Sequence, residues 1–309
     1  MTTVLYTHPI CLEHDAGPHH PERPERLEAV LAALASDEFA ALERLEAPRA
    51  SQAQLARVHD QSYIEDIFAA VPARGHVQID PDTAMSPSSG EAALRAAGAA
   101  IAAVDRVLND EAARAFCAVR PPGHHAEPAR AMGFCLFNNV AVAAAQARAV
   151  HGLDRVAVVD FDVHHGNGTQ TMFESDAGLF YASTHQSPNY PGTGDPSERG
   201  VAGNIVNAVM SPGDGSPEFR AAMTGTVLPA LRDFGPELVL ISAGFDAHMA
   251  DPLAQLNLTA DDFAWATAAL VDVAEACCAG RVVSVLEGGY DLAALAECAA
   301  AHVRALMGS

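Results

Sequence analysis

The sequence predicts an α/β fold in which a mostly parallel central sheet is flanked by helices. Short apolar runs rich in β-branched residues alternate along the chain with longer helical stretches. The runs lack polar alternation, which indicates strands covered on both faces, as in a parallel sheet. No repeat, low-complexity linker or block of charge divides the 309 residues, so we expect a single domain over residues 1–309.

The individual elements follow from these patterns in chain order. The apolar runs predicted as strands are Val4–Thr7, Ala115–Val119, Val156–Val159, Leu179–Ser183, Ile205–Val209, Leu238–Ser242 and Val282–Leu286. Helices are expected near 22–35, 88–108, 138–151, 217–234, 259–279 and 291–307. Ser88 with Glu91 has the pattern of a capping box at a helix start, and Thr259 with Asp262 has a weaker one.

Composition and charge exclude several classes of function. The formal net charge is −21, from 39 acidic and 18 basic residues, and every basic residue is arginine. Without lysine the chain has no amine for Schiff-base or pyridoxal chemistry. It also lacks a basic stripe that would neutralise phosphates, so no direct nucleic-acid ligand is expected. An acidic surface tolerates cationic substrates, although solubility is the simpler explanation.

Cysteine usage and the N-terminus favour a cytoplasmic protein. The cysteines show no C-x-x-C pair and no disulfide-like spacing, which indicates reduced thiols. The N-terminus lacks a basic stretch followed by an apolar core, so no secretory signal is expected. No run of about 18 apolar residues appears, so we expect no membrane span and no membrane partner.

Polar clusters directly follow strands that the pattern predicts. RPPGHH follows 115–119, DFDVHHGNG follows 156–159, GFDAH follows 238–242 and EGGYD follows 282–286. Open parallel sheets bind ligands outside the carboxyl ends of their strands. We therefore expect these clusters to meet at one edge of the sheet.

Asp162, His164 and Asp246 are candidate metal ligands by residue type. One imidazole and two carboxylates leave a divalent ion open positions for water and substrate, as a catalytic zinc requires. Asp162 and His164 share one side if the strand stays extended past Asp160. A D-x-H pattern alone more often has a structural role. A second, bridging ion would want a carboxylate at Gly166, so one metal per chain is expected.

His124, His125 and Tyr290 are candidate catalytic groups. Adjacent imidazoles can serve as a general base and an electrostatic partner beside a metal-bound water. Taken alone they are more often structural histidines, and the metal set reverses that preference. Tyr290 follows two glycines that can turn the backbone sharply, and its phenol can donate to a developing oxyanion. A tyrosine that only caps the sheet edge is an equal alternative.

Together these segments resemble the zinc-dependent histone deacetylase family, which includes acetylpolyamine amidohydrolases and acetoin-utilisation proteins. The resemblance runs from HPERPERL (20–27) to about residue 292 through RPPGHHAEPARAMGFCLFNN, VDFDVHHGNGTQ, SAGFDAHMADPLAQLNLT and LEGGYDL. GFCLFNN, H-H-G-N-G and SAGFDA–DPL are more similar to the class II branch, which includes bacterial enzymes of the histone deacetylase and acetylpolyamine amidohydrolase types. The resemblance implies the arginase–deacetylase fold.

The resemblance also implies roles at matching positions. Zn²⁺ would be bound by Asp162, His164 and Asp246. His125 would be the general base and His124, held by Asp160, its electrostatic partner, while Tyr290 would stabilise the tetrahedral intermediate. Asn167 would face the second histidine. The walls of an acyl-lysine channel would be formed by Phe134, Tyr190, Gly133, Leu253 and Gly289. A structural K⁺ ion would be bound by Asp160, Asp162, His164, Ser183 and Thr184.

The function implied is removal of acetyl or other short acyl groups from the ε-amine of lysine in proteins or peptides. An acetylpolyamine-type deacetylase of small acetylated amines is the alternative, although Leu253 stands where polyamine-specific relatives carry a glutamate. A catalytically silent acyl-lysine-binding module is a remote alternative, because a binder needs neither His125 nor Tyr290. Met85 aligns where other members use a polar residue to grip the substrate backbone, and Asp82 is a candidate substitute. The oligomeric state stays open, a homo-oligomer included.

Overall fold

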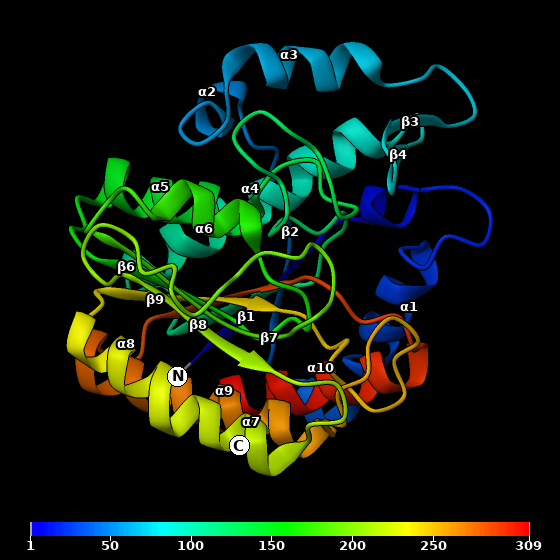
Figure 1. Cartoon of the computed structure of the whole chain (residues 1–309). Coiled ribbons are helices and arrows are strands. Elements are labelled where there is room, and N and C mark those ends of the chain that lie inside the picture. Colours follow the sequence, from blue (N-terminus) through cyan, green and yellow to red (C-terminus); the bar gives the residue numbers. More distant parts are fainter. Residues whose placement is uncertain (1, 309) are drawn as a thin grey trace.

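The computed structural model describes residues 2–308 and has α/β architecture (Figure 1). Across these residues, eight parallel strands form one central sheet in the order β2-β1-β5-β10-β9-β6-β7-β8. The strands of this sheet are β1 (Thr3–Thr7), β2 (Glu43–Glu46), β5 (Arg114–Cys117), β6 (Val156–Asp160), β7 (Leu179–Gln186), β8 (Ile205–Met210), β9 (Leu238–Ala243) and β10 (Val282–Leu286). The predicted mostly parallel sheet with flanking helices is confirmed.

The central strands are buried along their whole length because helices cover both faces of the sheet. In β6, β9 and β10 every residue is buried, and their sequences VAVVD, LVLISA and VVSVL are nearly all apolar. The edge strand β2 differs, since its residues ERLE alternate between half-buried and exposed. Continuous apolar runs therefore mark the middle of this sheet.

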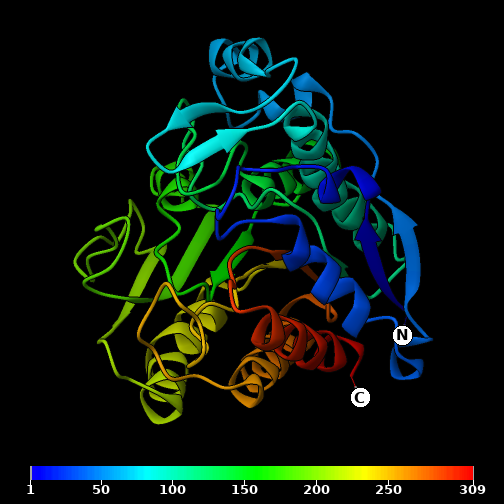
Figure 2. The same ribbon diagram turned by 90° about the vertical axis from the view of Figure 1, so that its right-hand side faces the viewer.

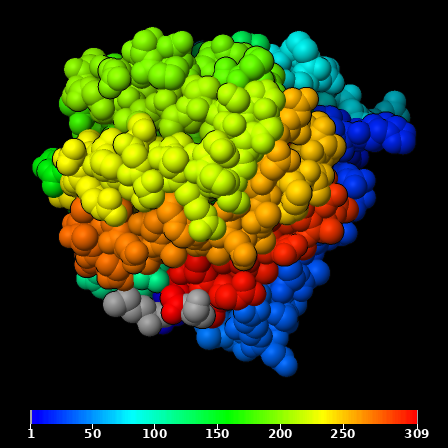
Figure 3. All heavy atoms as spheres, turned by 60° about the horizontal axis from the view of Figure 1, so that its bottom comes forward, coloured from blue at the N-terminus to red at the C-terminus, as the bar shows by residue number. Residues whose placement is uncertain are grey.

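Helices form one layer on each face of the sheet (Figure 1). One layer contains α4 (Ser89–Leu108), α5 (Asn139–His151) and α6 (Asn167–Phe173). The other contains α1 (Pro24–Ala33), α7 (Ser216–Ala222), α8 (Leu228–Phe234), α9 (Ala260–Cys278) and α10 (Leu292–Met307). The space-filling view shows the yellow segment that contains α7 and α8, the orange segment that contains α9 and the red segment that contains α10 as neighbouring bands across this face (Figure 3).

A smaller group of elements packs on the outside of α4 (Figure 2). It contains α2 (Gln52–Leu55), α3 (Gln61–Ala70) and an antiparallel hairpin of β3 (Val77–Asp80) and β4 (Thr83–Met85). A second apolar cluster attaches this group to the rest of the protein, because Leu55, Ile64 and Met85 pack with Leu94 and Phe137. The end of this hairpin brings Asp82 to the entrance of the cavity described below.

All the apolar runs predicted as strands are strands, but shorter or more polar elements were not predicted. These are β2, β3, β4, α2, α3 and α6. The helix expected near 217–234 is interrupted, because Met223–Val227 forms a π-helical turn between α7 and α8. Pro229 follows this turn and has no backbone N–H for the regular ladder, which explains a break at this point.

One of the two predicted helix caps is wrong. Ser88 makes no capping bond, because its hydroxyl donates to Glu13 Oε2 at 3.0 Å, and Glu91 forms ion pairs with Arg49 and Arg95. In the second pattern Asp262 Oδ2 accepts from the backbone N–H of Thr259 at 3.1 Å, as a capping box requires. Across residues 2–308, no helix is both long and apolar enough to cross a membrane.

Candidate active site

The polar clusters meet at the carboxyl edge of the sheet, which faces the viewer in Figure 2. The four strands that precede them, β5, β10, β9 and β6, are consecutive neighbours in the middle of the sheet. Because these strands are parallel, their following loops lie side by side. Residues from 124 to 290 are brought together in this way.

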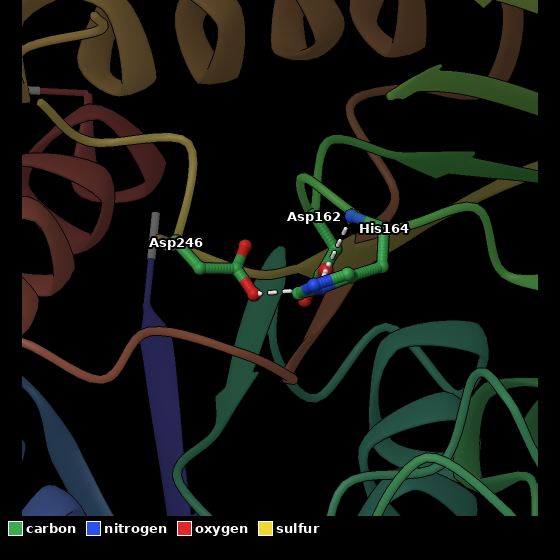
Figure 4. A group of neighbouring side chains, drawn as sticks. All are labelled: Asp162, His164 and Asp246. Atoms are coloured by element: carbon green, nitrogen blue, oxygen red, sulfur yellow. Dashed lines mark hydrogen bonds and ion pairs between the residues drawn. The ribbon is translucent and has the colours of Figure 1, made fainter. Parts of the chain in front are cut away.

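Asp162, His164 and Asp246 converge on one point (Figure 4). His164 Nδ1 lies 3.0 Å from Asp162 Oδ1 and 3.2 Å from Asp246 Oδ2. One ligand atom from each residue lies within 4.8 Å of the others, and all three residues are buried. The predicted ligand residues are thus adjacent in space, although 82 positions separate the last two in the chain.

The condition that the strand stays extended past Asp160 is not met, because β6 ends at that residue. Two successive side-chain turns replace it. Asp160 Oδ1 accepts from the Asp162 N–H at 3.1 Å, and Asp162 Oδ1 accepts from the His164 N–H at 2.9 Å. Aspartates favour such local bonds to the backbone two residues on. The turns therefore bring Asp162 and His164 together without an extended chain.

The surroundings of the three side chains fit a divalent cation. Asp246 Oδ2 is buried, and it accepts no hydrogen bond from any of residues 2–308. A side chain at Gly288 would bring its Cβ to 2.1 Å from this atom and to 2.5 Å from Asp162 Oδ2, so glycine keeps the space beside both carboxylates. Two adjacent buried carboxylates are costly unless a cation lies between them. Burial opposes a charge on His164, but both carboxylates raise the pKa of its imidazole to about 10.

His124 is held in a charged state by carboxylates. Its Nδ1 lies 2.9 Å from Asp160 Oδ2, and its Nε2 lies 3.9 Å from Asp162 Oδ1. Burial disfavours the charged ring, but Asp160 and Asp162 raise the pKa of His124 to about 10. Asp160 is shared, because the Tyr181 hydroxyl donates to the same Oδ2 at 3.1 Å. The predicted His124–Asp160 pair is present.

His125 is held in a neutral state with one nitrogen free. Its Nδ1 lies 2.8 Å from Asn167 Oδ1. The amide of Asn167 is oriented by Glu127, whose Oε1 accepts from Asn167 Nδ2 at 2.8 Å, so Asn167 Oδ1 must accept from His125. Burial and the neighbouring imidazoles of His124 and His164 lower the pKa of His125 well below its usual range. This leaves His125 Nε2 unprotonated, as a base requires.

The Tyr290 phenol lies between a cation and an aromatic ring. The Arg26 guanidinium sits 4.9 Å from the centre of the Tyr290 ring, and the Phe134 ring lies edge-on at 5.8 Å. Burial raises the pKa of Tyr290 well above its usual range. The phenol therefore stays protonated and can act as a hydrogen-bond donor.

A cavity of about 270 Å³ leads from the surface to these groups. The Tyr190 ring stands edge-on to His125 at 5.1 Å and lines this cavity together with Phe134. The lining residues are Asp82, His125, Gly133, Phe134, His164, Asn189, Tyr190, Leu253 and Tyr290. Of the residues predicted at the channel, Gly289 is the exception, since it lies outside the described lining and its missing side chain faces Leu295 and Phe245.

This geometry agrees with a family model, the histone deacetylase domain, which matches residues 20–306. The chain belongs to the histone deacetylase family. It is 44% identical over 273 residues to a histone deacetylase-like amidohydrolase of Pseudomonas aeruginosa, covering 87% of this chain and 72% of the relative. It is also 40% identical over 280 residues to the human polyamine deacetylase HDAC10, covering 86% of this chain and 41% of that protein.

A solved structure of the same family supports the fold. The crystal structure of the HDA15 HD domain superposes with a TM-score of 0.94 at 36% identity, covering 100% of this chain and 88% of the other. The arginase–deacetylase fold that the resemblance implied is confirmed. A single domain over 1–309 stays a prediction.

The predicted potassium residues of this histone deacetylase-family chain overlap the metal-ligand set, since Asp162 and His164 belong to both. Asp160 on β6 pairs in register with Ser183 on β7. The Thr184 hydroxyl is buried and has no hydrogen-bond partner among residues 2–308. Potassium binding stays a prediction.

Several polar residues at the site were not assigned a role from the sequence. Glu287 Oε2 accepts from the backbone N–H groups of Gly123 at 2.6 Å and His124 at 3.1 Å, so it holds the histidine loop. Tyr181, which bonds Asp160, and Asp251 are two others. The signal available was that Glu287 and Asp251 lie within the same polar motifs as Tyr290 and Asp246.

Proposed function

We propose that the protein is a zinc-dependent deacetylase that removes acetyl or other short acyl groups from the ε-amine of lysine in proteins or peptides. One observation carries this proposal. A neutral His125, the metal-ligand set and the Tyr290 phenol all line or adjoin the same narrow cavity. Relatives named as deacetylases and amidohydrolases support hydrolysis of an amide.

Asp162, His164 and Asp246 would hold one Zn²⁺ per chain. When bound, such an ion supplies Lewis acidity that polarises an amide carbonyl and acidifies water. The missing carboxylate at Gly166 supports a single ion, because a bridged pair needs further acidic ligands. Asp160, Asp162, His164, Ser183 and Thr184 would hold a structural K⁺ ion.

His125 would act as the general base. Its Nε2 accepts a proton from the water as the water oxygen attacks the amide carbon. When the C–N bond then breaks, the electron pair stays on the amine nitrogen, which takes the proton back from His125. The products are a carboxylic acid and an amine, and the acid's proton passes to the amine to give a carboxylate and an ammonium group. Asn167 keeps the required tautomer throughout, because its Oδ1 is committed to His125 Nδ1.

His124 and Tyr290 would stabilise the negative charge that forms during the reaction. His124 stays protonated beside Asp160, so it contributes a fixed positive charge next to His125, with ring centres 4.0 Å apart. The Tyr290 hydroxyl donates to the substrate oxygen as that oxygen becomes anionic. Neither group needs to change its protonation state, which reduces reorganisation during the step.

The cavity suits a long, thin side chain. Phe134 and Tyr190 would contact the methylene groups of an acyl-lysine, and Leu253 adds an apolar wall where an acidic residue would attract an amine. Small acetylated polyamines are the second candidate substrate, supported by the likeness to a protein named as a polyamine deacetylase. The apolar Leu253 favours the lysine substrate.

The test compares both substrates on the metal-loaded protein. We expect turnover of an acetyl-lysine fluorogenic peptide that a chelator abolishes and Zn²⁺ restores. Turnover of N-acetylputrescine alone would establish the second candidate instead. Binding of the acetylated peptide without any hydrolysis would contradict both and leave a silent binding module.

A further inference from the structure

Asp251 is a buried carboxylate at the site that the metal-ligand set and the proposed mechanism do not use. It follows β9 in the loop that carries Asp246, and it is 8% exposed. Its Oδ2 accepts from the backbone N–H of Tyr290 at 2.7 Å and from that of Asp291 at 3.4 Å. Its Oδ1 accepts from the backbone N–H of Leu253 at 3.0 Å. One side chain therefore joins the loop after β9 to the loop after β10.

The loop after β10 depends on such contacts from other elements. Gly288 donates to Asp162 Oδ2 at 2.8 Å, and the Gly289 carbonyl accepts from Arg26 Nε at 2.6 Å. Gly289 itself has φ +120°, a conformation that side chains rarely adopt, so local preference does not fix the chain here. The bond to Asp251 is the one made by the Tyr290 backbone N–H.

We propose that Asp251 is a positioning residue that holds the Tyr290 phenol, and with it the Leu253 wall, in place around the substrate. This inference rests on the proposed function, because it concerns the oxyanion donor of that reaction. Without Asp251, three peptide N–H groups lose their acceptor, two of them in the loop after β10, and that loop can shift. A displacement of about 1 Å at a catalytic group can cost about 10²-fold in rate.

The first variant is Asp251→Asn, which keeps the shape of the side chain. One of its two oxygens becomes an NH₂ group that faces a backbone N–H, so one bond is replaced by a donor–donor contact. We expect kcat to fall about 10- to 100-fold, with KM changed by less than about threefold. Asp291→Asn is the matched control. It makes the same change at the residue directly after Tyr290, at a helix N-cap where asparagine serves equally well.

A double-mutant cycle with Tyr290→Phe separates positioning from general damage. In the Tyr290→Phe background, Asp251→Asn should lower kcat by less than about twofold, because the phenol to be positioned is absent. An equal loss in both backgrounds would overturn the proposal, as would a wild-type kcat in Asp251→Asn. Loss of bound zinc from Asp251→Asn would also overturn it, since Asp251 would then act through Asp246.

Amide hydrogen exchange provides a readout that does not need activity. The peptide that covers residues 286–292 should exchange faster in Asp251→Asn than in the wild type or in Asp291→Asn. Unchanged exchange would overturn the proposal even if kcat fell. Exchange can be measured in a protein that has no deacetylase activity. A failure of the proposed function can therefore be distinguished from a failure of the positioning role of Asp251. If Asp251→Asn does not fold, Asp251→Ser removes both oxygens without adding an amide donor, and the same outcomes apply.

Discussion

Two regions of the molecule bury histidines deeply and give them opposite chemistry. Between α9, α10 and β10, His302 is fully buried, with Nδ1 at 2.6 Å from the Thr267 hydroxyl and Nε2 at 2.8 Å from the Ser284 hydroxyl. Burial lowers the pKa of His302 to about 3. At the carboxyl edge of the sheet, His124 is 3% exposed, yet Asp160 and Asp162 raise its pKa to about 10.

The difference shows that the partner, and not burial, decides what a buried histidine can do. Hydroxyl groups satisfy both nitrogens of His302 and leave it neutral and inert among phenylalanine rings. A carboxylate fixes a charge on His124. An oriented amide leaves His125 neutral with one free nitrogen. Exposed fraction alone would not separate these three side chains.

The strongest test of the catalytic region removes a metal ligand. Asp246→Ala should lose bound zinc and deacetylase activity together, because three protein ligands leave no redundancy. Metal analysis and peptide turnover measure both effects. Asp272→Ala, at an exposed position on α9, is the control and should retain both. Full zinc content in the Asp246→Ala variant would contradict the role of Asp246 as a metal ligand.

Removing the His125 imidazole, with its unprotonated Nε2, should have the next largest effect on activity. His125→Ala should lower kcat by about 10²–10⁴-fold, since general base catalysis contributes about that much. Zinc content should stay at the wild-type level, because His125 is outside the ligand set. A kcat within tenfold of the wild type would show that another group takes the proton.

The Tyr290 phenol allows a finer test at the same edge. Tyr290→Phe should lower kcat by about 10²–10³-fold with KM nearly unchanged, because an oxyanion donor acts mainly in the transition state. Its melting temperature should match that of the wild type. The alternative, a tyrosine that only caps the sheet, gives the opposite pattern of lower stability with normal kcat.

His302 should respond in the reverse way. His302→Ala leaves the Ser284 hydroxyl without its partner beside a cavity, whereas the Thr267 hydroxyl keeps its bond to the Phe263 carbonyl. The free energy of unfolding should therefore fall by about 2–4 kcal/mol. Denaturant unfolding measures this change, and kcat of the folded, zinc-loaded variant should stay within about twofold of the wild type. A large loss of kcat would mean that the two regions are coupled.

A further expected effect is on the acid dependence of stability. The pKa of His302 is lower in the folded protein than in the unfolded chain, so the unfolded chain binds more protons between about pH 6.5 and 3. Stability from the neutral ring is thus present above that window and is lost as the pH falls through it. In metal-free protein, His302→Gln should make the free energy of unfolding depend less on pH between about pH 6.5 and 3. An unchanged dependence on pH would contradict the lowered pKa of His302.

How much of the fold was predictable depended on burial. Continuous apolar runs marked the strands in the middle of the sheet, whereas β2 was missed because the edge sequence ERLE alternates like a surface segment. The short α6 was missed because NGTQTMF has weak helix formers and is fixed by its packing.

The residues of the proposed site were easier to predict than the residues that hold them. Asp162, His164, Asp246, His125 and Tyr290 all lie in loops that follow neighbouring parallel strands, so the topology places them at one edge. The roles of Glu287 and Asp251 depend on backbone N–H groups 164 and 39 positions away in the chain. No residue pattern encodes such contacts, because every peptide group is a candidate donor.

The position of β10 has a consequence for how the protein is made. This last strand lies between β5 and β9, and it links the part of the sheet formed by β2, β1 and β5 to the part formed by β9, β6, β7 and β8. Until it emerges from the ribosome, the two halves share no strand pairing and the open edges of β5 and β9 are free to pair wrongly. The proposed site is thus completed in one late event, when residues 282–290 join the two halves of the sheet and bring Tyr290 to its edge.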